Sequence, residues 1–166
     1  MEALTQDFFK LWEDEIAAYQ EVALILDEQK NTLMKWNIKE FQNVTQKAAM
    51  TISHAHTITD RRNDLMESIC LLKNIEPGQT SLKNLDTVFE DEEIQEKSRI
   101  FFKVFSNTLR KIDSLSNENK ELIRTGLELV GDNLELIADI IDRDRVYSRV
   151  GIVNQSGTSL LINKRV

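Results

Sequence analysis

Proline and cysteine each occur once in this sequence of 166 residues, and glycine occurs only five times. The single cysteine, Cys70, excludes an internal disulfide framework. With so few prolines and glycines, the chain has few residues that favour turns. The 30% of charged residues suit the exposed faces of helices. This combination is typical of long helices, so the composition predicts an all-α protein.

Basic clusters and long apolar runs are also scarce. The net charge is −7, which is a poor match for nucleic acid, because phosphate contacts require clustered Lys and Arg. No apolar run approaches the roughly 20 residues of a membrane span. The start Met1-Glu2-Ala3 lacks the basic region of a signal peptide. We therefore expect a cytoplasmic protein with no nucleic-acid partner and no membrane insertion.

Side chains that perform catalysis or hold metals are not grouped in the sequence. His54 and His56 are two residues apart, so they point in different directions on a helix. The four carboxylates of Glu90 to Glu93 fit the solvated first turn of a helix better than a metal site. Phosphate-binding glycine loops and paired Glu-x-x-His motifs are absent from the sequence. We expect no enzyme activity, no cofactor and no metal.

Apolar residues at 3-4 spacing predict a first helix from about Glu2 to Lys35. The pattern Asn37-Ile38-Lys39-Glu40 matches a capping box, which predicts a tight turn followed by a second helix to about Lys73. The alternative is one continuous helix with a kink at this point. Pro77-Gly78 cannot continue the second helix.

Residues 74–90 are the best candidate for a linker. Within them Ser81 could cap a short helix that runs through Phe89. A third helix would follow, with its acidic first turn placed favourably against the helix dipole. It would end in or near the mixed-charge run from Asp142 to Arg145.

The stretch from Phe101 to Ile141 contains no proline and carries three lines that repeat every seven residues, the period of coiled-coil packing. Together they form a face wider than one coiled-coil seam needs. The face must therefore cover several neighbours, or one neighbour inside the molecule and one outside it. The lines are Leu115, Leu122, Leu129 and Leu136; Phe102, Leu109, Ile123, Val130 and Ile137; and Phe105, Ile112, Asn119, Gly126, Asn133 and Ile140.

Asn119, Gly126 and Asn133 interrupt this apolar face at intervals of seven. A buried Asn can fix the register of packed helices by penalising slipped pairings. Small and polar residues between leucine walls can equally form the floor of a groove for a partner. Both interpretations stay open at the level of the sequence.

These patterns predict an all-α fold of three helices with coiled-coil packing and a flexible C-terminal tail. The helical bundle domain would span residues 1–145 and the tail residues 146–166. The tail contains three basic residues, no acidic residue and no helical period. Val150 to Val153 and Leu160 to Ile162 could pair there as weak strands.

Two C-terminal segments, Leu115-Ser116-Asn117-Glu118-Asn119-Lys120-Glu121-Leu122-Ile123 and Tyr147-Ser148-Arg149-Val150-Gly151, carry a resemblance to a known family. They are similar to the Leu-Asn-x-x-Asn-x-x-Leu-Leu stretch and the Tyr-x-x-x-Gly element of FlgN-type flagellar export chaperones. Ser116 departs from the usual Asn of that stretch. Glu28-Gln29, Lys47 and Arg62 resemble further positions of the family's first two helices.

The resemblance implies an elongated antiparallel three-helix bundle or coiled coil. It also implies a bacterial chaperone that holds newly made hook-filament junction proteins, hook-associated proteins 1 and 3, through its C-terminal helix. It would deliver them to the membrane protein of the flagellar type III export gate, with the export ATPase complex as a further candidate partner. Tyr147 and Gly151 would dock on the gate. The residues expected to bind the client are Ile112, Leu115, Asn119, Leu122, Ile123, Gly126, Leu129, Val130, Asn133, Leu136 and Ile137.

Two other functions are compatible with the same patterns. A self-associating coiled-coil adaptor with no client would use the surplus apolar face as a homodimer interface. A helical-bundle enzyme or metal protein is disfavoured, because the paired ligand motifs of such bundles are absent from the sequence.

Overall fold

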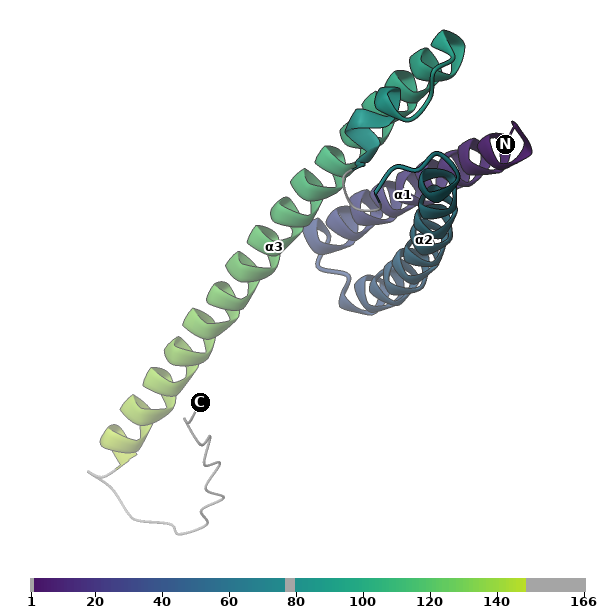
Figure 1. The fold of residues 1–166 in the computed structure, drawn as a ribbon. Helices are drawn as coiled ribbons and strands as arrows, with labels where there is room; N and C mark the ends of the chain where they lie inside the picture. The colour runs from purple at the N-terminus through teal and green to yellow at the C-terminus, as the bar shows by residue number, and fades with distance from the viewer. Residues whose placement is uncertain (1, 77–79, 149–166) are drawn as a thin grey trace. The chain divides into compact units, whose positions relative to one another are not determined.

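A computed structural model describes residues 2–76 and 80–148 of the chain. Three α-helices and one short 3-10 helix follow one another, and the described residues contain no strand (Figure 1). The predicted all-α, three-helix fold is confirmed, whereas the two weak strands predicted in the tail lie outside the described residues. The elements are α1 (Glu2–Met34), α2 (Ile38–Leu72), η1 (Leu82–Thr87) and α3 (Glu92–Ser148).

The turn between α1 and α2 is built as the sequence predicts. Trp36 adopts a left-handed conformation with φ of 53°, and Asn37 N donates to Thr32 O at 3.0 Å, which closes a Schellman motif at the end of α1. The Asn37 side chain then accepts from Glu40 N at 3.2 Å and caps α2. The alternative of one kinked helix is therefore wrong.

The second helix ends before it reaches Pro77. Asn74 takes a left-handed conformation with φ of 56°, and Ile75 N donates to Cys70 O at 2.9 Å. This is a second Schellman motif, with an asparagine at the position that usually takes glycine. The stop signal of α2 is thus Asn74, and the proline follows it.

The segment predicted as a linker contributes to the core. Leu85 and Val88 are each 1% exposed and Phe89 is 4% exposed. They pack with Phe8 and Trp12 of α1 in the main apolar cluster. Ser81 stands at the N-cap position of η1, but its side chain makes no capping hydrogen bond. Residues 80–90 therefore close one end of the bundle and are more than a connection.

Polar contacts between α1 and α2 show that these two helices run antiparallel. Near one end, Arg62 Nη2 donates to Glu15 Oε1 at 3.2 Å and Thr59 Oγ1 donates to the same oxygen at 2.7 Å. Near the other end, Gln29 Nε2 donates to Thr45 Oγ1 at 2.8 Å. Glu15 is fully buried, so its charge is acceptable only because Arg62 and Thr59 satisfy it.

In contrast, α3 runs parallel to α1. The Phe9 and Phe101 rings meet with centroids 5.6 Å apart, and further along both helices Lys30 Nζ lies 2.6 Å from Glu118 Oε2. The order is therefore up, down, up, as expected for three consecutive helices of one bundle.

The chain divides into two compact units between Ile123 and Arg124, within α3. The bundle described above belongs to the first unit, residues 1–123. The described part of the second unit is the stretch of α3 over residues 124–148. The helix ends at Ser148, close to the mixed-charge run from Asp142 to Arg145 where its end was predicted.

Candidate protein-binding surface on α3

The apolar rows of α3 are covered over only part of their length. In the first unit, Phe105 and Leu115 are 9% and 7% exposed. Leu115 packs against Val22, Ala23 and Leu26 of α1. In the second unit, the large apolar side chains of residues 127–141 are all exposed. The wide apolar face predicted from the sequence is therefore buried in the first part of α3 and exposed in the second.

Asn119 marks the end of the covered part. Its side chain is 3% exposed, and Nδ2 donates to Leu26 O at 2.9 Å and to Gln29 Oε1 at 3.0 Å. Because Gln29 in turn donates to Thr45 of α2, one chain of hydrogen bonds crosses all three helices. A slipped register would separate these partners, so Asn119 acts inside the bundle as the register-control interpretation predicts.

We use the name C-terminal apolar surface for the eight large apolar side chains of residues 124–141. Each is between 49% and 68% exposed. Their spacings of three, four and seven place them on one side of the helix, over about half of its circumference. A continuous exposed apolar patch of this kind marks a binding surface on a protein. The eight are Leu127, Leu129, Val130, Leu134, Leu136, Ile137, Ile140 and Ile141.

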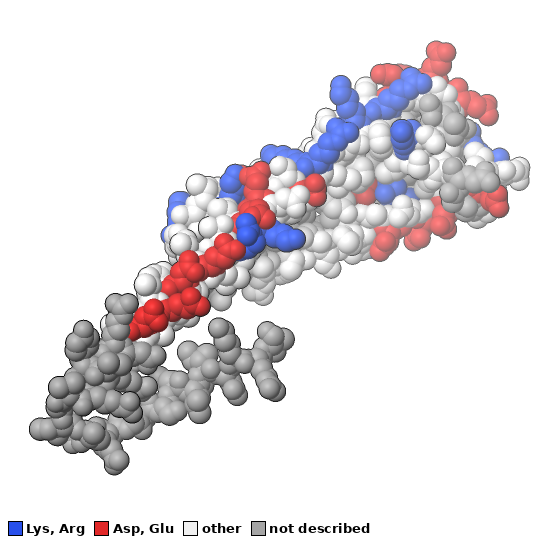
Figure 2. Space-filling view, turned by 90° about the vertical axis from the view of Figure 1, so that its left-hand side faces the viewer, with Lys and Arg blue, Asp and Glu red and all other residues white. Residues whose placement is uncertain are grey.

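Four carboxylates occupy the other side of the same segment. Glu128, Asp132, Glu135 and Asp139 are spaced 4-3-4, so they form a single acidic stripe. Figure 2 shows these acidic side chains gathered along the segment, with uncharged atoms beside them. Arg124 offsets one charge through an ion pair of 3.0 Å with Glu128, which leaves the segment at +1 − 4 = −3.

The structure divides the predicted client-binding residues into three groups. Leu115 and Asn119 are buried against α1 and serve internal packing. Ile112, Leu122 and Gly126 are partly exposed. The exposed residues are Ile123, Leu129, Val130, Asn133, Leu136 and Ile137.

Four members of the C-terminal apolar surface were not among the predicted site residues. Leu127, Leu134 and Ile141 form a further row with a period of seven, and this period could have revealed them. Ile140 lies on the same heptad line as Asn119 and Asn133. The sequence pattern includes it in the apolar face, but it is not among the predicted client-binding residues. Of the predicted gate-docking residues, Tyr147 belongs to α3, and Gly151 lies outside the described residues.

One ion pair links α1 and α3 close to Asn119. The hydrogen bond and charge of Glu118 raise the pKa of the Lys30 amine. The hydrogen bond from Lys30, followed by one from Ser114, lowers the pKa of the Glu118 carboxyl. Both side chains remain substantially exposed, so the pair positions the two helices more than it stabilises them.

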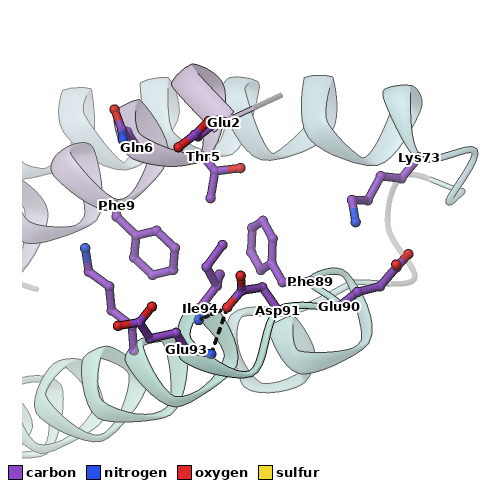
Figure 3. A pocket seen from close by; sticks show the side chains of 11 residues that line it. Glu2, Thr5, Gln6, Phe9, Lys73, Phe89, Glu90, Asp91, Glu93 and Ile94 are labelled. Carbon is purple, nitrogen blue, oxygen red and sulfur yellow. Dashed lines mark hydrogen bonds between the residues drawn. The ribbon is translucent and has the colours of Figure 1, made fainter.

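A cavity of about 500 Å³ lies where α1 and α3 begin. Figure 3 shows the Phe9 and Phe89 rings within it and charged side chains around it. The charges are of both signs, and Lys97 Nζ lies 4.7 Å from the centre of the Phe9 ring. Asp91 accepts from Glu93 N at 2.8 Å and so caps α3. The cavity thus combines helix-end packing with a cap.

The remaining reactive side chains of the described residues do not converge either. Within the described ranges, no three His, Cys, Asp or Glu side chains form a group that could hold a metal ion. Cys70 is buried, as expected of a packing residue. None of the helices over the described residues combines the length and apolar character that crossing a membrane requires.

Comparison with known proteins adds one match to this geometry. Residues 1–154 match the family model described as FlgN protein. No curated protein and no solved structure matches the chain. The match spans the first unit and continues into the second, where it includes the segment that carries the C-terminal apolar surface.

Proposed function

The chain belongs to the FlgN family of flagellar export chaperones, and from this premise we propose that it holds hook-associated proteins 1 and 3 before their export. The client would lie on the C-terminal apolar surface as an amphipathic helix. The protein would act in the cytoplasm as a binding protein, with no reaction of its own.

The C-terminal apolar surface is the observation that supports this proposal. A chaperone for segments that would otherwise self-associate needs a wide apolar surface and no catalytic group. Burial of a leucine there by a client contributes about 1.5–3 kcal/mol, and eight large side chains are available. Leu115 and Asn119 are left out of the proposed contact set, because α1 already covers them.

Delivery would involve a different part of the chain. We assign docking on the membrane protein of the export gate to Tyr147 and Gly151, with the export ATPase complex as a further candidate partner. Under this assignment, Tyr147→Ala leaves client binding intact and reduces secretion of the client. Normal secretion by this variant would remove the tyrosine from the mechanism.

The binding proposal is tested with the double variant Leu129→Ala/Leu136→Ala in the full chain. Both side chains are exposed, so the helical content should be unchanged, and the affinity for either hook-associated protein should fall about tenfold or more. Leu24→Ala is the matched control, because Leu24 is 66% exposed on α1. Client affinity equal to that of the unmodified chain in the double variant would show that the surface does not bind the client.

The same exposed surface also suits a second copy of the chain, as in a self-associating adaptor. Light scattering over a range of concentrations separates the two functions. A client-binding chaperone without its client should be monomeric or only weakly associated. An adaptor should keep the same oligomeric state at every concentration.

A further inference from the structure

The acidic stripe on residues 124–141 is not placed symmetrically about the C-terminal apolar surface. Asp132 lies three residues after Leu129 and four before Leu136, so it is a direct neighbour of both on the helix. Asp139 lies three residues after Leu136. The apolar surface therefore has one edge lined by two leucines and two carboxylates.

Over residues 124–141, the opposite edge carries no carboxylate. Leu127 and Leu134 form it, and their neighbours towards the polar side are Arg124, Gly131 and Ala138. A side chain at Gly131 would meet no atom within 4 Å, which shows how open this edge is. The two edges thus differ in charge, although both border the same apolar surface.

The carboxylates of the first edge are exposed, and among the described residues no ion pair or hydrogen bond engages Asp132 or Asp139. This contrasts with Glu128, which is paired with Arg124. Two unpaired charges of one sign beside an apolar surface favour a partner that brings the opposite sign to the same place.

We propose that the client helix on the C-terminal apolar surface carries Lys or Arg along one flank of its apolar stripe, and that this flank lies against Asp132 and Asp139. The inference rests on the proposed function and adds the chemical class of the client segment. Because only one edge is acidic, the charges also select which flank of the client faces which edge.

A second copy of the chain fits this surface less well than a basic helix does. It would bring another segment of charge −3 against the first one, whereas a basic amphipathic helix would offset that charge. The charge pattern therefore favours a client over self-association.

The test compares two double variants of the full chain that remove the same charge. Asp132→Asn/Asp139→Asn removes the carboxylates at the apolar edge. Glu128→Gln/Glu135→Gln removes two carboxylates further from it, because Glu135 has no large apolar neighbour one turn away. Dissociation constants are measured against the client's terminal helical segment at low and at high salt.

The edge variant should bind about 3- to 10-fold more weakly than the unmodified chain at low salt, and most of the salt dependence should disappear. The control variant should stay within about twofold. Equal effects of the two variants, or no effect of either, would overturn the inference while client binding itself persists. A free chain that dimerises through Leu129 and Leu136 would also overturn it. Failure of the unmodified chain to bind any client would refute the proposed function instead.

Discussion

Asn119 and Asn133 show how the same residue type serves different purposes on one helix. They lie on the same heptad line of α3, and the sequence alone treats them alike. Asn119 is buried and donates two hydrogen bonds to α1, whereas Asn133 is exposed. Whether a neighbouring helix covers the position decides if the asparagine is buried and hydrogen-bonded or exposed.

This difference predicts that Asn119→Leu destabilises the protein. The substitution removes the buried side-chain donor to Gln29 Oε1 and the additional donor to Leu26 O, which costs about 1–3 kcal/mol in the free energy of unfolding. Urea denaturation followed by circular dichroism measures it. Asn133→Leu is the control and should change the free energy by less than about 0.5 kcal/mol. Equal stability of the two variants would argue against register control by Asn119.

The pair Lys30–Glu118 predicts a dependence of stability on pH. Because the pKa of Glu118 is lowered in the folded state, the stabilisation is present at neutral pH and is lost as the pH falls through that lowered pKa. Because the pKa of Lys30 is raised, the stabilisation is lost on the alkaline side only at strongly alkaline pH, where the amine loses its proton. Thermal unfolding should therefore show a lower Tm for Glu118→Gln than for the unmodified chain at pH 7. The difference should shrink as the pH falls through the lowered pKa of Glu118, because its carboxyl then becomes protonated. A difference that persists in acid would contradict the assignment.

At the scale of elements, α3 combines two parts with different roles. Leu115 belongs to the core with α1, and Leu129, two heptads later, is 49% exposed. We expect Leu115→Ala to lower the free energy of unfolding by about 2–4 kcal/mol, because it opens a cavity. Leu129→Ala should change it by less than about 0.5 kcal/mol. Denaturation midpoints of the two variants measure this contrast, and a large loss for Leu129→Ala would mean that this part of α3 is packed after all.

The helices and the first turn could be predicted from the sequence because their signals are local. The 3-4 periodicity, the Asn37 cap and the approximate end of α2 depend on neighbouring residues only. The same holds for the start of α3, whose acidic first turn is capped by Asp91.

The division of α3 into covered and exposed parts has no such local signal. The heptad repeat continues unchanged from the buried to the exposed leucines. The cause is length, since α3 has 57 residues while α1 and α2 have 33 and 35. At about 1.5 Å per residue, the shorter helices cannot cover the longer one throughout.

The role of residues 80–90 also escaped prediction from the sequence. Leu85, Val88 and Phe89 have the 3-4 spacing of a short helix, but this spacing does not show what the helix packs against. Their burial depends on contacts with Phe8 and Trp12, which are distant in sequence. A short 3-10 helix that closes the end of a bundle is recognised only when the bundle is seen.

At the scale of the whole molecule, the bundle core and the proposed binding surface belong to different units. The first unit has its own aromatic core, the buried Glu15–Arg62 pair and the Asn119 network. The described segment of the second unit has exposed apolar and acidic side chains instead. Substitutions on the C-terminal apolar surface should therefore alter binding without unfolding the protein.

The most direct test of the central claim is co-purification of the intact chain with hook-associated proteins 1 and 3 from the same bacterium. Each client is used at full length and without its terminal helical segment. We predict a stoichiometric complex with the full-length client that disappears when the segment is removed. Failure to bind either full-length client, or equal binding of the shortened ones, would contradict the account.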